Sequence, residues 1–403
     1  MYKLAILNTH PIQYFAPLYR RLAHEPDIDL TVYFCSRQGA EEYFDPGFGT
    51  KFKWDRPLVD GYHHCFLTNA RRRNEVAGFW SLINWEIIKE LWRNRYDALL
   101  VNGHSYATYL IAIFAAKLMM IPVFMRCDTH LSLPRSPIRR LIRKPLMRFF
   151  YNRVVTACLS IGTANREFYS YHGVSKSRLF SVPFVVDNKD FTMPSATSDE
   201  RAGLRAEIGL PGEKVVALFV SKLLPGKRPM DLLLAFERLG AGSSEAALAF
   251  VGSGEQEQAL RDHIASQQIQ NIYFFGFRNQ SELRKFYSAA DLFVFPSERE
   301  SWGLVLNEAM CAGLPVIVSH AVGSGADLVQ AGQNGFLFEA GNVDELTNCL
   351  RELLKSPDLR MRMGTRSREI IKDWDLESCV RGIREALTYV KPQKAQLTER
   401  EAA

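Results

Sequence analysis

Two glutamates, Glu300 and Glu308, are separated by seven residues that include a Ser-x-Gly turn. An apolar run at residues 292–295 precedes the turn and predicts a short buried strand, and the residues after the turn predict a helix. The turn therefore places a helix N-terminus at the carboxyl end of a strand. Amides in the first turn of a helix attract phosphates, and carboxylates can bind sugar hydroxyls. The stretch thus predicts a site for a phosphate and a sugar.

The positive groups of this site come from the helix start and from an earlier loop. The helix is expected to leave the amides of Gly303, Leu304 and Val305 available to an anion. Lys222 and Lys227 follow another predicted strand and lie on a loop at its carboxyl end. Cations of this kind neutralise the charge that develops on a leaving phosphate. Both lysines are therefore predicted to contact a diphosphate.

The pattern Glu-Ser-x-Gly-x-x-x-x-Glu-Ala at residues 300–309 resembles the signature of glycosyltransferase family 4, including its Glu-x7-Glu spacing. The loop with Lys222 and Lys227 resembles the basic loop of the same family, in which an Arg usually takes the place of Lys222. The resemblance is close over residues 212–350. It implies the GT-B fold, a retaining reaction and a nucleotide-diphosphate sugar as donor, with no metal and no other cofactor.

The resemblance also implies roles for single residues. Glu300 is expected to hold the donor sugar and Glu308 the ribose of the nucleotide, and Ser301 lies in the same donor site. The turn after the strand at 272–275 places Phe277 and Arg278 next to the nucleotide base in this family. These residues complete the predicted donor site.

The length of 403 residues favours two domains, because a single hydrophobic core seldom grows to this size. Predicted strands alternate with helices, and the alternation restarts after a polar segment at residues 194–200, which we interpret as the connection. The expected fold is α/β, with two doubly wound Rossmann-like domains that face a cleft. The expected parts are an N-terminal domain at 1–187 that a helix at about 371–391 completes, a C-terminal domain at 188–370, and a disordered tail at 392–403.

Polar side chains also follow the predicted strands of the first half. His10 and Gln13 follow the first strand, His104 follows a strand at residues 98–101, and Arg126 follows the next one. The carboxyl ends of parallel strands share an edge, where ligands bind in open α/β folds. These four residues are therefore candidates for binding the acceptor.

Asp128 and His130 follow the same strand as Arg126. In the family that the chain resembles, a histidine after this strand lies near the reacting sugar. Counting from Pro122 places Asp128, and not His130, at the equivalent position. Both residues stay candidates for a catalytic role.

The segment from Arg135 to Arg153 carries seven basic residues and no acidic one, interleaved with apolar side chains. A basic amphipathic segment fits an anionic membrane surface. It equally fits a helix whose apolar face packs on the core and whose cations are solvated, and both interpretations stay open. Pro137 and Pro145 are expected to limit the segment to short helical pieces.

Composition excludes several classes of function. The net charge of +6 is mild and no recognition motif accompanies it, so we expect no binding to nucleic acid. Seven scattered cysteines predict reduced thiols, and the first residues lack a signal peptide, which favours a cytoplasmic protein that can lie on the inner face of the membrane. The Asp27-Ile28-Asp29 triplet precedes a strand and is interpreted as a solvated turn without a metal.

We therefore expect a hexosyltransferase that moves a hexose or a related sugar to a glycan or a lipid-linked acceptor in the biosynthesis of a surface polysaccharide or glycolipid. A nucleotide-sugar epimerase and a catalytically silent subunit that binds nucleotide sugar are the alternatives on the same scaffold. A glycoside hydrolase also uses paired carboxylates, but it does not need the two lysines and the helix amides.

Overall fold

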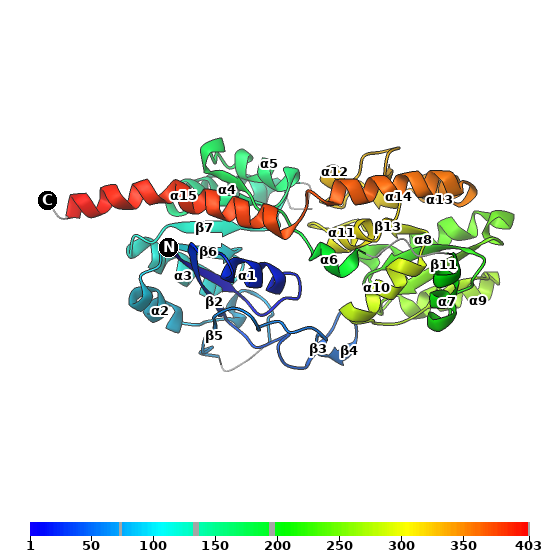
Figure 1. Cartoon of the computed structure of the whole chain (residues 1–403), viewed down its shortest axis with the longest axis horizontal. Helices are drawn as coiled ribbons and strands as arrows, with labels where there is room; N and C mark the ends of the chain where they lie inside the picture. Colours follow the sequence, from blue (N-terminus) through cyan, green and yellow to red (C-terminus); the bar gives the residue numbers. More distant parts are fainter. Residues whose placement is uncertain (72–74, 132–136, 193–197, 402–403) are drawn as a thin grey trace. The chain divides into compact units, whose positions relative to one another are not determined.

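The computed structural model describes residues 1–71, 75–131, 137–192 and 198–401, which form two compact units (Figure 1). Unit 1 contains Met1–Tyr43, Arg56–Phe184 and Leu376–Ala403. Unit 2 contains Phe44–Asp55 and Val185–Asp375. The sequence placed the main boundary a few residues later, at 187, and did not anticipate that the segment 44–55 joins the second unit.

A sheet of seven parallel strands forms the centre of unit 1, in the order β5-β2-β1-β6-β7-β8-β9. Most of these strands are continuous apolar runs, which is typical of parallel strands buried on both faces. The strands are β1 (Tyr2–Asn8), β2 (Ile28–Phe34), β5 (His64–Phe66), β6 (Ala98–Asn102), β7 (Val123–Arg126), β8 (Ala157–Ser160) and β9 (Leu179–Ser181).

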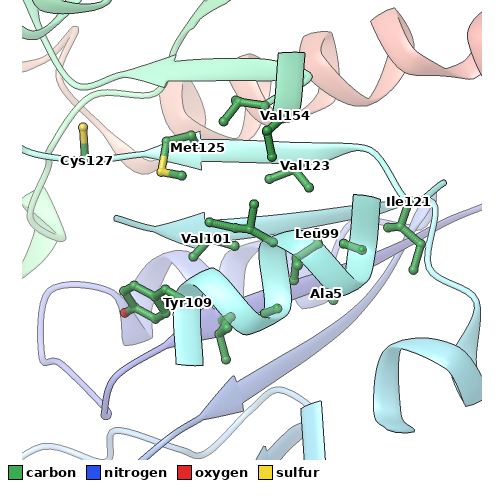
Figure 2. Packing of buried hydrophobic residues seen from close by; sticks show 14 of the residues in the cluster. Ala5, Leu99, Val101, Tyr109, Ile121, Val123, Met125, Cys127 and Val154 are labelled. Carbon is green, nitrogen blue, oxygen red and sulfur yellow. The ribbon is translucent and has the colours of Figure 1, made fainter. Parts of the chain in front are cut away.

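Helices cover both faces of this sheet. Tyr109 and its neighbours on α3 pack against Ala5, Leu99 and Val101 of the strands, in a core that α2 and α5 extend (Figure 2). On the other face α1 packs against α15. The helices are α1 (Ala16–Ala23), α2 (Glu86–Asn94), α3 (Ala107–Leu118), α4 (Pro137–Phe149), α5 (Thr163–Tyr171) and α15 (Leu376–Glu401), with short helical turns at η1 (Phe79–Ser81), η2 (Phe150–Val154) and η3 (Lys176–Arg178).

Two expectations for unit 1 differ from the structure. The helix α4 continues through Pro145 instead of breaking there, and a π-helical turn at η2 follows it, while Arg135 lies outside the described residues. The helix α15 includes residues 392–401, where a disordered tail was predicted.

A sheet of six parallel strands forms the centre of unit 2, in the order β12-β11-β10-β13-β14-β15. Two of these strands match the strands predicted at 272–275 and 292–295, and a third precedes Lys222, as expected. The strands are β10 (Val215–Val220), β11 (Ala246–Val251), β12 (Ile272–Phe274), β13 (Leu292–Phe295), β14 (Val316–Ser319) and β15 (Gly335–Phe338).

The helices of unit 2 form a layer on each side of the sheet. The helices α8 and α13 pack together over buried strand residues such as Phe219 and Phe250, and α11 packs against α14. The longer helices are α7 (Ser198–Ile208), α8 (Pro229–Glu237), α9 (Glu257–Gln267), α10 (Gln280–Ala289), α11 (Leu304–Cys311), α13 (Val343–Lys355) and α14 (Pro357–Ile371). The shorter ones are α6 (Asn188–Phe191), η4 (Pro225–Lys227), η5 (Gly240–Ser243) and α12 (Gly325–Leu328).

The polar segment at 194–200 is not the connection between the units. Residues 193–197 lie outside the described part of the chain, and α7 begins at Ser198 inside unit 2. The segment 44–55 forms the small two-stranded sheet of β3 (Tyr43–Asp45) and β4 (Thr50–Phe52).

All seven cysteines are free thiols, as predicted. Burial raises the pKa of Cys349 to about 11. Within the described residues, every helix is too short or too polar to cross a lipid bilayer. Asp27 lies in a turn before β2, where its carboxylate accepts a hydrogen bond from Arg384 at 2.8 Å.

Candidate functional site

The loops that follow the strands of unit 2 gather at one edge of its sheet, because all these strands are parallel. The loop after β10 is joined to the loop after β13. The carbonyl oxygen of Gly226 accepts hydrogen bonds from the Ser297 hydroxyl and from the amide of Glu298, both at 3.0 Å. This connection aligns the side chains that the two loops carry.

Lys227 and Glu300 meet across these two loops. The Lys227 ammonium donates a hydrogen bond to the Glu300 carboxylate, and both side chains are about one-fifth exposed, at 22% and 19%. The ammonium also lies 5.7 Å above the ring centre of Phe295. The structure thus brings together a cation and a carboxylate that the sequence assigned to the same site.

The helix α11 starts immediately after this pair. Its N-cap residue, Gly303, has φ +90°, and no side chain caps the helix. A Cβ atom on Gly303 would lie 2.5 Å from the Phe295 ring, so the position requires glycine for both conformation and space. The partly exposed backbone of Gly303, Leu304 and Val305 therefore forms an anion-attracting helix N-terminus beside Glu300.

The loop with Glu300 and Ser301 is also held from its other side. The Glu300 carbonyl accepts a hydrogen bond from the amide of Gly323 at 3.0 Å. A Cβ atom on Gly323 would lie 2.0 Å from the Ser301 carbonyl oxygen, so glycine permits this close approach. Partly exposed Ser301 thus lies on a loop whose position is fixed by backbone contacts.

Lys222 has a different partner, which comes from the segment 44–55. Its ammonium donates hydrogen bonds to the two carboxylate oxygens of Asp45 at 2.8 and 3.0 Å. It also lies 4.7 Å above the ring centre of Phe48. Both cations of the predicted diphosphate site are therefore paired with carboxylates.

Glu308 is fully buried on α11, in contrast to partly exposed Glu300. Its carboxylate accepts a hydrogen bond from the Tyr287 hydroxyl at 2.7 Å. The side chain that was predicted to hold a ribose therefore does not reach solvent. Burial, together with the negative charge of Glu308, raises the pKa of Cys311.

Phe277 and Arg278 follow β12 and are engaged within unit 2. The Phe277 ring lies 4.3 Å from that of Phe52 and 4.8 Å from that of Phe48. The Arg278 guanidinium donates to the Phe275 carbonyl and to Glu282, both at 3.0 Å. Both residues remain partly exposed.

The predicted acceptor residues of unit 1 are held by their own unit. His10 and Gln13 are half-buried, and a ring nitrogen of His10 lies 2.9 Å from the Thr9 hydroxyl. Burial lowers the pKa of His10 to about 4, so its imidazole is neutral at pH 7. His104 packs against the rings of Phe150 and Tyr151.

Arg126 is almost completely buried, with 4% exposure. Its guanidinium donates to the carbonyl oxygens of Val182 and Pro183 at 3.3 and 2.7 Å and stacks over the Phe184 ring at 4.5 Å. Burial lowers its pKa. These contacts tie two strand ends of unit 1 together, which is a structural role that the sequence did not predict.

The two candidates after β7 differ in exposure. Asp128 is exposed, whereas His130 is buried. Asn165 holds the loop between them through a hydrogen bond to the Thr129 carbonyl at 2.8 Å. Of the two, only Asp128 presents a side chain to solvent.

Asp45 and Ser253 are the site residues that sequence reasoning missed. No role was predicted for Asp45, and its partner Lys222 lies 177 positions away. The Asp-Pro-Gly sequence at residues 45–47, flanked by aromatics, was a signal for a turn. Among the described residues, no group of three or more His, Cys, Asp or Glu side chains could hold a metal ion.

Comparisons with known proteins identify the family to which the chain is similar. The family model described as glycosyl transferases group 1 matches residues 200–370. Spore coat protein SA of Bacillus subtilis is 30% identical over 329 residues, which cover 78% of this chain and 81% of that protein. A GDP-mannose-dependent monoacylated α-(1-6)-phosphatidylinositol monomannoside mannosyltransferase of Corynebacterium glutamicum is 31% identical over 220 residues, 53% of this chain and 56% of that protein.

Among solved structures, Anabaena HepE in complex with UDP and glucose has a TM-score of 0.72 at 20% identity, and the match covers 96% of this chain and 100% of that chain. This likeness confirms the predicted fold class, GT-B with two Rossmann-like units. The chain spans only about half to three-fifths of the length of several curated relatives.

Proposed function

Because the chain belongs to the glycosyl transferases of group 1, we propose that it transfers a hexose or a related sugar from a nucleotide-diphosphate donor to a glycan or lipid-linked acceptor, with retention of configuration and without a metal ion. Transferase activity follows from the family. The retaining, metal-independent reaction follows from the likeness of residues 300–309 to family 4. Synthesis of a surface polysaccharide or glycolipid on the cytoplasmic side of a membrane is the setting that we propose.

One observation supports the proposal above all others. Lys227 and Glu300 meet at the N-terminus of α11, on loops that hydrogen bonds join at Gly226. A cation and helix-end amides favour a diphosphate, and a carboxylate favours the hydroxyls of a sugar. One strand edge therefore offers partners for both halves of a nucleotide sugar.

In this reaction the two lysines and the amides of Gly303 and Leu304 stabilise the departing diphosphate. Glu300 orients the donor sugar, and Glu308 binds the ribose once Tyr287 releases it. The leaving phosphate takes the proton of the acceptor on the same face of the sugar, so no side chain has to act as a base.

The unit 1 candidates complete the proposal. Asp128 is exposed and can orient an acceptor hydroxyl. Neutral His10 can accept or donate a hydrogen bond but offers no positive charge at pH 7. We assign acceptor binding to His10 and Gln13, and we assign no direct acceptor contact to Arg126.

The first test is thermal unfolding with UDP, GDP, ADP and dTDP, each with and without a chelator. UDP and GDP come first, because HepE was crystallised with UDP and the mannosyltransferase relative uses GDP-mannose. A ligand at one hundred times its dissociation constant stabilises the folded state by about 2.7 kcal/mol, which is readily measured. Stabilisation by one diphosphate in chelator supports the donor site, and no response to any of them contradicts it.

A transfer assay then separates the alternatives. Consumption of the matching nucleotide sugar only in the presence of an acceptor supports a transferase. Conversion of the donor without an acceptor would identify an epimerase, and tight binding without any turnover would identify a silent subunit.

We also propose that unit 1 contacts an anionic membrane. Three helices on one face of its sheet, α2, α3 and α4, each carry exposed apolar side chains next to a cation. At α2, Trp85, Lys89 and Trp92 follow helical spacing and are all exposed. The same holds for Phe114, Lys117 and Leu118 on α3, and for Arg143, Leu146 and Phe149 on α4.

These exposed side chains on α2, α3 and α4 suit binding to an anionic bilayer surface because they combine large apolar groups with positive charge. Tryptophan prefers the membrane interface, and each basic residue near an anionic surface adds about 1 kcal/mol of attraction. The test is sedimentation with anionic and with zwitterionic vesicles at low salt. Sedimentation with anionic vesicles only supports the proposal.

The matched variants are Trp92→Glu on α2 and Met361→Glu on α14 of unit 2, since both replace exposed apolar side chains. Trp92→Glu should reduce vesicle binding by about tenfold, and Met361→Glu should leave it unchanged. Equal loss in both variants, or no sedimentation of the unchanged protein, would contradict the membrane proposal.

A further inference from the structure

The segment 44–55 lies between two parts of unit 1 in the sequence but packs within unit 2. It contacts the loops after β10, β11 and β12, which are three neighbouring strands of the sheet. These loops carry Lys222, which the proposed function assigns to the diphosphate, and Phe277 and Arg278, which the sequence predicted to lie next to the base.

The first contact is the ion pair between Asp45 and Lys222. Asp45 is 16% exposed and Lys222 is 32% exposed, so solvent partly screens the pair. The amides of Gly47 and Phe48 donate to the same carboxylate at 2.8 and 3.1 Å, which holds Asp45 in a tight turn. A Cβ atom on Gly47 would lie 2.7 Å from the Lys222 ammonium, so glycine lets the turn lie directly on this lysine.

The second and third contacts fasten the rest of the segment. The Ser253 hydroxyl, after β11, donates to the Phe48 carbonyl at 2.8 Å. The Asn279 side chain, after β12, donates to the Lys53 carbonyl at 2.8 Å, and the Ser281 amide donates to Asp55 at 3.0 Å. The segment is therefore attached at three points along the strand edge.

An aromatic cluster fills the space between these points. The rings of Phe48, Phe52 and Trp54 surround that of Phe277 at centre distances of 4.8, 4.3 and 6.4 Å. Phe52 is 7% exposed, so the cluster anchors the segment by burial of apolar surface. The carboxylate of Asp45 is thus presented to Lys222 by a well-packed element.

We propose that the segment 44–55 is part of the donor site, and that Asp45 competes with the diphosphate of the donor for Lys222. This inference rests on the proposed function of the edge. A carboxylate and a phosphate are both anions that accept hydrogen bonds from an ammonium group. A diphosphate that binds Lys222 must therefore take over hydrogen bonds that Asp45 now receives, and Asp45 lowers the affinity for every ligand that carries a diphosphate.

The test compares Asp45→Asn with Asp344→Asn in the full chain. The first substitution keeps a side-chain oxygen for the amides of the turn but removes the negative charge that faces Lys222. The second also removes one carboxylate of an ion pair in unit 2, but Asp344 lies on α13, pairs with Arg238 and is not part of the segment 44–55. Dissociation constants are measured by calorimetry for the nucleoside diphosphate that binds, for inorganic pyrophosphate and for the nucleoside alone.

The expected result is about two- to fivefold tighter binding of the nucleoside diphosphate and of pyrophosphate to Asp45→Asn, in line with the strength of a partly exposed ion pair. Affinity for the nucleoside and the affinities of Asp344→Asn should stay unchanged. Unchanged or weaker diphosphate binding by Asp45→Asn would overturn the inference, and weaker binding would mean that Asp45 orients Lys222.

The experiment distinguishes a failure of the proposed function from a failure of the role proposed for Asp45. If the unchanged protein binds neither a nucleoside diphosphate nor pyrophosphate, the proposed function fails and this inference fails with it. If the unchanged protein binds a diphosphate and Asp45→Asn gains no affinity, only the role of Asp45 is overturned.

Discussion

The carboxyl edges of the two parallel sheets differ in the exposure of their charged side chains and in the groups that these side chains contact. At the edge of unit 2, Lys227 pairs with Glu300 and Lys222 pairs with Asp45, and these side chains are about one-sixth to one-third exposed. At the edge of unit 1, the cation Arg126 is buried and bonded to backbone carbonyls.

Exposure and the type of partner therefore distinguish a cation that can bind a ligand from a cation that stabilises the fold. A partly exposed ammonium that pairs with a carboxylate can exchange this partner for a phosphate at little cost, since such ion pairs contribute only about 0–1 kcal/mol. A buried guanidinium that satisfies two carbonyls cannot leave without exposing unpaired polar groups. We therefore expect mutations at the first edge to alter ligand binding or turnover, and mutations at the second edge to alter stability.

The largest effect should come from Glu300→Gln. The variant keeps the size of the side chain but removes the charge that pairs with Lys227 and is proposed to orient the donor sugar. We expect the transfer rate to fall by about 10²- to 10³-fold, with nucleotide binding retained, as measured by initial rates and by thermal shift.

Glu298→Gln is the matched control, because Glu298 lies in the same loop and pairs with Arg228. It should keep most of its activity. Unchanged turnover in Glu300→Gln would contradict the proposal that this carboxylate orients the donor sugar.

Arg126→Met should affect stability instead. The loss of the guanidinium leaves the carbonyls of Val182 and Pro183 without this donor, and we expect the free energy of unfolding to fall by about 2–4 kcal/mol. Urea unfolding measures the loss, and Arg166→Met, at an exposed position, is the control. A stable Arg126→Met protein that has lost transfer activity would show that this edge binds the acceptor through its cation.

The two edges also differ in how far the sequence predicted them. In unit 2, the apolar strands, the Ser-x-Gly turn and the helix after it are local features, and the structure places Glu300 and Gly303 between β13 and α11 as the sequence indicated. Short-range patterns determine these elements, whereas the binding roles of their residues stay predictions.

The contacts that the sequence could not predict join distant residues. Asp45 meets Lys222 only because the segment 44–55 packs within unit 2, and Arg126 meets Val182 only because β7 and β9 lie in one sheet. Glu308 accepts a hydrogen bond from Tyr287, which lies 21 positions away on α10. No local sequence pattern predicts these contacts, because they depend on the packing of elements that are far apart in the chain.

Gly303→Ala tests whether the edge of unit 2 depends on its backbone. Alanine at φ +90° is strained, and its Cβ atom would lie 2.5 Å from Phe295, so we expect a loss of about 1–3 kcal/mol in stability and weaker diphosphate binding. Gly203→Ala in α7 is the control, since a Cβ atom there meets nothing within 4 Å and alanine favours the helix. Equal stability and equal diphosphate binding of the two variants would mean that the turn accommodates alanine without strain.

The smallest effect should be the change in the pH dependence of stability on replacing His10, because burial lowers the pKa of His10 to about 4. The pKa of histidine in an unfolded chain is about 6.5, so between about pH 6.5 and 4 the unfolded state binds more protons than the folded state. Stability therefore rises with pH across this window and is lost as the pH falls. We expect His10 to cost about 1–2 kcal/mol between about pH 7 and pH 5, and His10→Gln to remove this part of the pH dependence in urea unfolding. The same pH slope in both proteins would mean that the pKa of His10 is the same in the folded and the unfolded chain, and would contradict a pKa lowered by burial.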